Sequence, residues 1–209
     1  MNTVAEKIAS ELLEIKAIKL EPVNSFTWAS GWQSPIYCDN RKTLSFPKVR
    51  ECIKREFVNL IKEKYPDVEV IAGVATGAIA HGVLVAQAMD LPFIYVRSSA
   101  KSHGMENLIE GYYEKGQKVV VVEDLISTGG SSLKAVNALR AADCEVLGMV
   151  AIFTYGFSLS KDNFAKAGCE LTTLSNYDAM IDLAIKSGYV LASEENKLKQ
   201  WRLSPETYK

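Results

Sequence analysis

The fold of this sequence is decided by residues 119–131, which read VVVVEDLISTGGS. Four β-branched residues in a row, without alternation, are typical of a strand that is buried on both faces of a sheet. Two acids end the strand, and a run of small residues then leads into a helical pattern. Open α/β sheets bind ligands where such strands end, so this turn is the first candidate site.

Outward from this stretch, other apolar runs of the same character alternate with helical patterns. The predicted strands are Val68–Val74, Phe93–Val96, Lys118–Glu123 and Val146–Phe153. The predicted helices are Phe46–Lys64, Ile79–Met89 and Ser131–Ala142. Strands that alternate with helices predict an α/β fold with a doubly wound, mostly parallel sheet.

The two ends of the chain differ from this core. Residues 1–41 are predicted to form a helix and a small antiparallel cap, or hood, that contributes to the site. Residues 42–209 are predicted to form the core. The tail from Tyr177 carries two further helical patterns. The connection 98–117 is longer than most links between elements, which is typical of a functional flap, and Ile109–Tyr113 is predicted to be a short strand in one arm of it.

Composition narrows the function classes. The 209 residues are 48% hydrophobic and carry a net charge of −1, so there is no overall electrostatic case for nucleic acid or an anionic membrane. Four scattered cysteines, without metal-ligand spacing, predict reduced thiols. The first 20 residues lack the continuous apolar stretch of an export signal, and no segment is apolar over a bilayer's width. We expect a cytoplasmic protein without nucleic-acid or membrane partners.

The turn after the central strand has the chemistry of a phosphate site. Glycines and small hydroxyls let backbone N–H groups and a helix N-terminus surround a phosphate. Glu123 and Asp124 would repel a bare phosphate, so they favour a phosphorylated sugar whose hydroxyls they bind, with Mg²⁺ nearby. No lysine follows Gly130 as a Walker A loop requires, and no GxGxxG is present. A purely structural strand, turn and capped helix remains the alternative.

Four motifs, in order along the chain, carry a resemblance to a known family. Residues 119–131 resemble the phosphoribosyl pyrophosphate (PRPP) motif of the type I phosphoribosyltransferases. Residues 97–104, RSSAKSHG, resemble the mobile catalytic loop of the orotate-specific members, and residues 26–37, FTWASGWQSPIY, resemble their orotate-binding segment. Residues 73–77, GVATG, resemble their pyrophosphate loop.

The resemblance implies transfer of the phosphoribosyl group from PRPP to orotate, with Mg²⁺ held mainly by PRPP, in a homodimer whose loops reach into the partner's site. It implies catalytic roles for Arg97, Lys101, His103 and Asp124. It implies PRPP contacts from Thr76, Gly77, Arg97, Lys101, His103, Glu123, Asp124, Leu125, Ile126, Ser127, Thr128, Gly129, Gly130 and Ser131. It implies orotate contacts from Ser30, Gly31, Tyr37 and Ser127. No protein ligand to the metal is implied other than Asp124.

The chain departs from the family pattern where many members carry positive charge. Ala29 stands where a lysine often precedes SG, Thr76-Gly77 replaces a Tyr-Lys pair, and Ser98 replaces a second lysine. Residues 154–156 also lack an arginine that some members use. These departures give more weight to the cationic residues of the 97–104 loop.

Each singled-out side chain also has an ordinary interpretation. Arg97 and Lys101 alone could be solvated charges, and His103 an incidental surface histidine. His81 is expected to be structural, and Trp28 and Trp32 to pack the cap. Two rival functions remain: a purine or uracil phosphoribosyltransferase, which the SGxxSP segment disfavours, and a PRPP-sensing regulator, which the absence of a basic domain disfavours.

Overall fold

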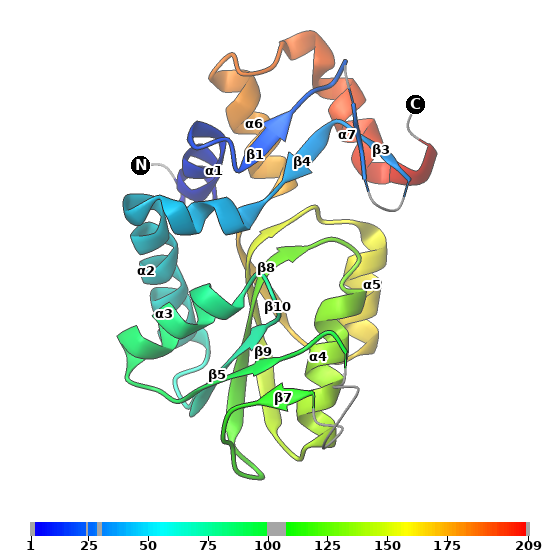
Figure 1. Cartoon of the computed structure of the whole chain (residues 1–209). Helices are drawn as coiled ribbons and strands as arrows, with labels where there is room; N and C mark the ends of the chain where they lie inside the picture. The colour runs from blue at the N-terminus through cyan, green and yellow to red at the C-terminus, as the bar shows by residue number, and fades with distance from the viewer. Residues whose placement is uncertain (1–2, 24, 29–30, 100–107, 208–209) are drawn as a thin grey trace.

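The computed structural model describes residues 3–23, 25–28, 31–99 and 108–207. Its core is a six-stranded sheet with the order β10-β9-β8-β5-β6-β7 (Figure 1). The strands are β5 (Val70–Val74), β6 (Phe93–Val96), β7 (Ile109–Glu110), β8 (Lys118–Ile126), β9 (Glu145–Thr154) and β10 (Leu171–Asn176). Neighbouring strands are parallel except β6 and β7, which are antiparallel. The predicted α/β fold with a doubly wound, mostly parallel sheet is confirmed.

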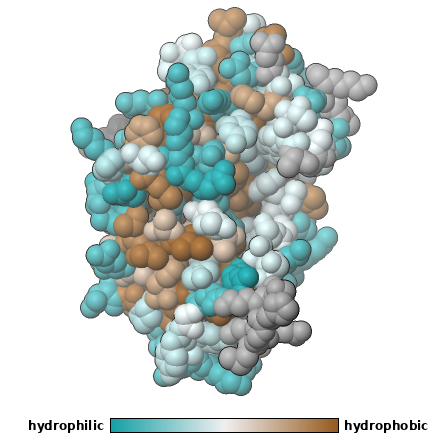
Figure 2. Space-filling view, in the orientation of Figure 1, coloured by the Kyte–Doolittle hydropathy of each residue, from teal (hydrophilic) through white to brown (hydrophobic). Residues whose placement is uncertain are grey.

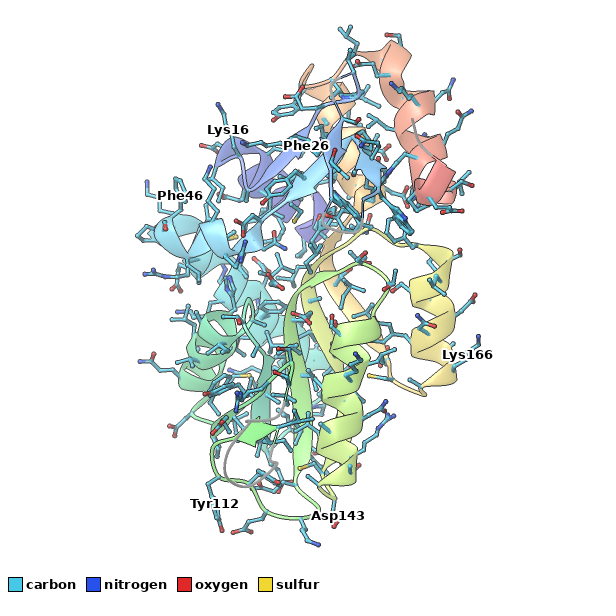
Figure 3. The ribbon with its side chains drawn as sticks, turned by 45° about the vertical axis from the view of Figure 1, so that its right-hand side comes forward. Lys16, Phe26, Phe46, Tyr112, Asp143 and Lys166 are labelled. Carbon is cyan, nitrogen blue, oxygen red and sulfur yellow. The ribbon has the colours of Figure 1, made fainter. Side chains whose placement is uncertain are left out.

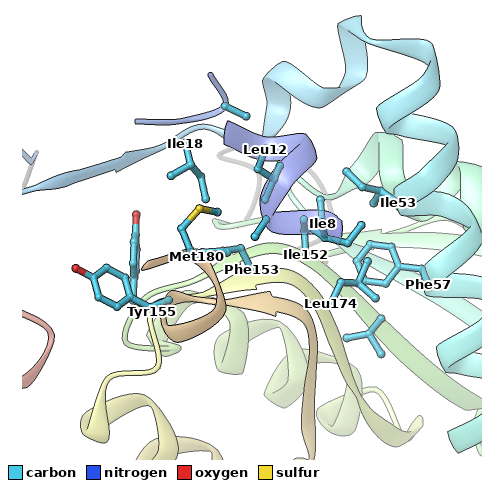
Figure 4. Close-up of a cluster of buried hydrophobic side chains, with 14 of the residues drawn as sticks. Ile8, Leu12, Ile18, Ile53, Phe57, Ile152, Phe153, Tyr155, Leu174 and Met180 are labelled. Carbon is cyan, nitrogen blue, oxygen red and sulfur yellow. The ribbon is translucent and has the colours of Figure 1, made fainter. Parts of the chain in front are cut away.

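Helices cover both faces of this sheet (Figure 1). One face carries α1 (Val4–Glu14), α2 (Pro47–Lys64) and α3 (Ile79–Met89), and the other carries α4 (Gly130–Ala141) and α5 (Ser158–Lys166). The valines of Val119–Val122 alternate between the two buried clusters that these helices form with the sheet. Figure 4 shows part of the larger cluster, where Leu12 of α1 and Phe57 of α2 lie over the sheet. Burial on both faces explains the unbroken valine run.

Most element bounds agree with the sequence patterns, and the differences have physical reasons. The strand of the opening stretch continues from Glu123 to Ile126, because Leu125 and Ile126 still pair with β9. The patterns did not predict α5 or β10. β10 reads LTTLSN, a short and partly polar edge strand, and α5 buries just Ser160 and Phe164 among its described residues.

A small cap lies beyond the carboxyl ends of the core strands (Figure 1). It contains two antiparallel pairs, β1 with β4 and β2 with β3. Their bounds are β1 (Ile18–Leu20), β2 (Phe26–Thr27), β3 (Gln33–Ser34) and β4 (Ile36–Cys38), and the 3-10 helix η1 (Asn40–Ser45) follows. The predicted N-terminal helix and antiparallel cap are therefore present.

The C-terminal tail packs against this cap. It forms α6 (Tyr177–Lys186), the short η2 (Ala192–Glu194), α7 (Glu195–Leu203) and η3 (Pro205–Thr207). The Trp201 indole of α7 donates to the Gln33 carbonyl at 3.2 Å, and its ring lies 5.6 Å from that of Trp28. The predicted packing role of Trp28 is confirmed, and the tail packs against the cap through α7.

All four cysteines are free thiols, as predicted. Within residues 3–207, apart from the three internal gaps, no helix has both the length and the apolar character to cross a membrane. Figure 2 shows polar and apolar side chains interspersed over the face that is seen in Figure 1.

Candidate active site

The order in which the chain adds strands to the sheet reverses between β5 and β8. These strands are neighbours, but the chain leaves β5 towards β6 on one side and leaves β8 towards β9 on the other. Ligands of open α/β sheets bind in the crevice outside such a switch point. A cavity of about 430 Å³, here called the polar cavity, opens there. Its lining residues are Cys38, Asp39, Arg41, Val74, Ala75, Thr76, Gly77, Glu123, Asp124, Leu125 and Ser131.

The paired acids at the end of β8 have different surroundings. Glu123 is 5% exposed, and its carboxylate accepts hydrogen bonds from the Asp124 backbone N–H at 2.9 Å and the Ser132 hydroxyl at 2.8 Å. Burial, and then the charge of Asp124, raise the pKa of Glu123 to about 8. Asp124 is the more exposed acid, and its carboxylate lies so close to Gly77 that any Cβ there would overlap it.

The predicted phosphate loop connects β8 to α4. Gly129 has a φ of +81° and immediately precedes the helix, and a Cβ there would meet the Phe164 ring at 2.7 Å. The Asn163 side chain donates to the Thr128 carbonyl at 2.9 Å, so α5 supports the loop from outside. The positive N-terminus of α4 therefore faces the switch point on a fixed backbone, as a phosphate site requires.

The second predicted loop, residues 73–77, begins in the last two residues of β5 and continues into the turn after it. Thr76 and Gly77 line the polar cavity opposite Asp124, with a cis peptide bond between Ala75 and Thr76. The structure thus brings together the two loops that the sequence separates by about fifty residues, as the resemblance implied.

A second cavity of about 280 Å³, here called the aromatic cavity, adjoins the first. Its lining residues are Thr27, Trp28, Tyr37, Cys38, Leu125, Ser127 and Tyr155, of which Cys38 and Leu125 also line the polar cavity. Two of the residues that are predicted to contact orotate, Tyr37 and Ser127, line this cavity. Gly31 lies in the turn between β2 and β3 with a φ of +86°, and Ser30 is outside the described residues.

A buried asparagine that the sequence patterns did not single out joins cap and core. Asn40 is 1% exposed, and its Nδ2 donates to the Asp124 carbonyl at 2.6 Å. The main-chain carbonyl of Asn40 accepts a hydrogen bond from the Thr43 hydroxyl at 2.5 Å. Because that hydroxyl proton is used, the Thr43 oxygen accepts from His81 Nε2 at 3.0 Å. The chain of bonds runs from the end of β8 through η1 to α3.

His81 completes this joint. Its Nδ1 has no hydrogen-bond partner within the described part of the chain, consistent with a neutral ring protonated on Nε2. Burial, and then the nearby Arg50 charge, lower the pKa of His81 to about 4. The expectation that His81 is structural is supported by its burial and by its absence from the lining of either cavity.

Asp39 and Arg41 flank Asn40 and also line the polar cavity. Asp39 Oδ1 accepts from Arg41 Nε at 2.7 Å and from the Arg41 backbone N–H at 3.2 Å. This ion pair holds the pKa of Asp39 below its ordinary value. The sequence signal for these residues was the polar run DNR directly after the cap strand.

Arg97 follows β6, at the start of the predicted flap. Its guanidinium pairs with Glu110 at 3.4 Å, and its backbone N–H donates to the Leu108 carbonyl at 2.8 Å. It does not line either cavity. The predicted short strand is confirmed over Ile109–Glu110. Lys101 and His103 lie outside the described residues.

The second arm of the predicted flap leads away from the cavities. Because β7 runs antiparallel to β6, residues 111–117 form the turn that enters β8 at its amino end. Figure 3 shows this separation, with Tyr112 and Asp143 at the opposite end of the molecule from Phe26 of the cap. Residues 111–117 of the predicted flap therefore lie away from the candidate site.

Comparisons with known proteins agree with this geometry. A model of the phosphoribosyl transferase domain matches residues 41–186. Over 208 residues the chain is 59% identical to an orotate phosphoribosyltransferase of Porphyromonas gingivalis, with 100% of this chain and 99% of the relative covered. It is 52% identical over 206 residues to that of Listeria monocytogenes, with 99% of each covered.

Solved structures give the same result. The crystal structure of orotate phosphoribosyltransferase from Aeropyrum pernix matches with a TM-score of 0.76 and 25% identity, over 88% of this chain and 99% of that one. Given this fold, the switch-point cavity between two phosphate-type loops, and more than half identity over nearly the whole length, the chain belongs to the phosphoribosyl transferase domain family, among the orotate phosphoribosyltransferases.

Proposed function

We propose that this chain transfers the phosphoribosyl group of PRPP to orotate, giving orotidine 5′-monophosphate and pyrophosphate in pyrimidine synthesis. The observation that carries the proposal is the pair of adjoining cavities, which share Cys38 and Leu125. The polar cavity suits a charged sugar phosphate, and the aromatic cavity suits a planar ring beside it. A ring nitrogen in the second cavity would lie next to the ribose carbon in the first.

PRPP would be held by both loops. Backbone N–H groups of residues 127–131 and the N-terminus of α4 would bind its 5′-phosphate. Asp124 would accept hydrogen bonds from the ribose hydroxyls. Glu123 has lone pairs beyond the two that Ser132 and the Asp124 N–H use, and would take a further hydroxyl. Thr76 and Gly77 would lie along the pyrophosphate.

Orotate would bind in the aromatic cavity. Ser127 and Tyr37 offer hydroxyl groups among apolar and aromatic walls, which is the usual construction of a small-molecule site. Ser30 and Gly31 of the cap would complete this end of the site. The shared Leu125 would separate the ring from the ribose hydroxyls.

The chemical step needs no nucleophilic side chain, because orotate brings its own nitrogen. The ribose C1–pyrophosphate bond breaks while positive charge develops on the sugar, and the pyrophosphate leaves with negative charge. The chain would hold the two reactants in line and stabilise these charges. Asp124 would lie on the side of the ribose. Arg97, Lys101 and His103 would approach the leaving group and exclude water from it.

The residues at the polar cavity fit a magnesium ion carried by the substrate. Mg²⁺ in such sites keeps several waters and binds one or two carboxylates together with substrate phosphates. Asp124 and Asp39 offer carboxylates there, and no cluster of three or more His, Cys, Asp or Glu side chains suited to a metal occurs in the described ranges. Asp124 is the residue that would contact the ion. When bound, Mg²⁺ would neutralise charge on the departing pyrophosphate.

We further propose a homodimer in which the loop of residues 97–104 completes the partner's site. The support is the resemblance of this loop to that of the family, together with the position of Arg97 outside either cavity lining in its own chain. A cytoplasmic location remains a prediction from the sequence.

The deciding experiment follows the loss of orotate absorbance on addition of PRPP and Mg²⁺. Activity that needs both, and that EDTA abolishes, is the expected result. Adenine, guanine, hypoxanthine and uracil replace orotate in parallel reactions and should give no nucleotide. Turnover of one of these bases in place of orotate would assign a different phosphoribosyltransferase, and PRPP binding without any turnover would favour a regulator.

A further inference from the structure

The polar cavity has an unbalanced set of charges. Three of its lining residues carry carboxyl groups, Asp39, Glu123 and Asp124, of which the two aspartates are charged near neutral pH because the pKa of Glu123 is raised to about 8. Among the described lining residues Arg41 is the single cation. The ligand proposed for this cavity carries a monophosphate and a pyrophosphate. A guanidinium or ammonium group placed among the carboxylates would offset their repulsion of phosphate oxygens and bind them through charged N–H donors.

The loop opposite Arg41 has no means of supplying that charge. Residues 73–77 read GVATG and contain no ionisable side chain. A side chain at Gly77 would overlap the Asp124 carboxylate, so a longer cationic residue does not fit there without moving that acid. A cation for this side of the cavity must therefore come from another element.

Arg41 is held in an orientation suited to this task. Asp39 Oδ1 takes its Nε–H and its backbone N–H, and neither Nη group has a hydrogen-bond partner in the described part of the chain. A guanidinium anchored through Nε still presents paired N–H donors, the geometry that phosphate oxygens accept. The side chain is 63% exposed, so an arriving ligand can reach these donors. The hydrogen bond to Asp39 and the charge of that acid, and then the charge of Asp124, raise the pKa of Arg41 above its ordinary value.

We infer that Arg41 is a PRPP-binding residue that the cap supplies, with its Nη groups binding the pyrophosphate. This inference rests on the proposed PRPP site. It also gives the cap a second role, since the run CDNR places Cys38 at the ring cavity, Asn40 under Asp124 and Arg41 at the pyrophosphate.

The alternative is that Arg41 and Asp39 form an ordinary surface ion pair, which would contribute little to stability and nothing to PRPP binding. The chain offers a matched control for that case. Arg55 on α2 pairs with Glu56 at 3.3 Å and has a side chain 53% exposed, but it lines neither cavity. If Arg41 were a solvated charge, Arg41→Gln and Arg55→Gln would behave alike.

The experiment measures KM for PRPP, KM for orotate and the affinity for magnesium pyrophosphate by calorimetry. Arg41→Gln is expected to raise KM for PRPP at least about tenfold and to weaken pyrophosphate binding similarly, as for a lost hydrogen bond to a charged group. The orotate KM should change less than twofold, Arg41→Lys should recover part of the loss, and Arg55→Gln should match wild type. Melting temperatures verify that each variant folds.

The outcomes separate this inference from the proposed function. If wild type turns over orotate while Arg41→Gln keeps the PRPP and pyrophosphate affinities of wild type, the inference is wrong and the function stands. A rise in orotate KM alone also overturns it. If Asp124→Asn leaves PRPP binding unchanged, the proposed site itself is misplaced.

Discussion

The side-chain amide of Asn40 donates a hydrogen bond to the main-chain carbonyl of Asp124, with 2.6 Å between Nδ2 and the oxygen. This bond links residues 84 positions apart and connects the cap to the acid that faces the polar cavity. Since Asn40 is almost fully buried, water cannot replace its amide. The position of Asp124 therefore depends on a residue that makes no proposed contact with substrate.

Asn40→Ala should separate this positioning role from simple stability. A buried carbonyl left without its donor costs about 1–3 kcal/mol of unfolding free energy. Asp124 would also lose its fixed place, so we expect KM for PRPP to rise several-fold while KM for orotate changes little. Chemical denaturation and steady-state kinetics measure the two effects. Asn59→Ala on the exposed face of α2 is the control, and a stability loss with unchanged KM for PRPP would contradict the positioning role.

Ser127→Ala tests the assignment of the aromatic cavity. Ser127 lines that cavity beside Tyr37 and is absent from the lining of the polar cavity. Removal of one neutral hydrogen bond costs about 1 kcal/mol, which is about fivefold in KM. The increase should appear in KM for orotate. If KM for PRPP changed instead and KM for orotate did not, Ser127 would belong to the phosphate loop alone.

The sequence was most informative where the chemistry is local. Residues 119–131 specify a strand, its end and a phosphate-type turn within thirteen positions, so fold and site could be predicted together. Loop 73–77 was predicted through its resemblance to the family's pyrophosphate loop, and its closeness to Asp124 is a finding of the structure.

What the sequence did not predict depends on contacts between distant residues. The run DNR after a cap strand is typical of any polar turn, and nothing local indicates that Asn40 meets Asp124 or that Arg41 enters the cavity. Likewise, Glu123 and Asp124 are adjacent acids, and the sequence alone does not indicate which of them is buried. Their difference in burial arises because Ser132 on α4 lies against one of them.

The burial of Glu123, which raises its pKa, predicts how the stability of the protein depends on pH. Glu123 has an ordinary pKa of 4.5 when unfolded and about 8 when folded. Between these values the folded state binds more protons than the unfolded state, so this residue makes stability fall as pH rises from about 4.5 to 8. Glu123→Gln is neutral at every pH and keeps the shape. Its melting temperature should exceed that of wild type by an amount that grows from pH 5 to pH 8.5.

The control for this effect is Glu145→Gln, which changes an exposed glutamate at the start of β9. Its difference from wild type should stay flat over the same pH range. A difference for Glu123→Gln that is constant, or that shrinks as pH rises, would mean that Glu123 is ionised throughout and that Ser132 and the Asp124 N–H stabilise its charge.

The last prediction concerns the shared site. Lys101→Ala should lower kcat by about 10²–10³-fold, the scale for loss of one preorganised donor to a transition state. Asp124→Asn should be inactive for want of a ribose contact. If the 97–104 loop serves the partner's cavity, mixing the two variants with subunit exchange should restore activity, since one site of each mixed dimer combines an intact Asp124 with an intact loop. Random exchange makes about half of the dimers mixed, so about a quarter of wild-type activity is expected.

Exchange is verified with subunits that carry different tags, and each variant alone provides the baseline. The size of the recovery matters as well as its presence, because a loop that acts within its own chain leaves every site in every dimer with one defect. In that case demonstrated exchange would return no activity above the sum of the two variants. Arg97 pairs with Glu110 and lies outside either cavity lining of its own chain. If it acts across the same interface, the mixture of Arg97→Ala with Asp124→Asn should recover activity as the Lys101→Ala mixture does.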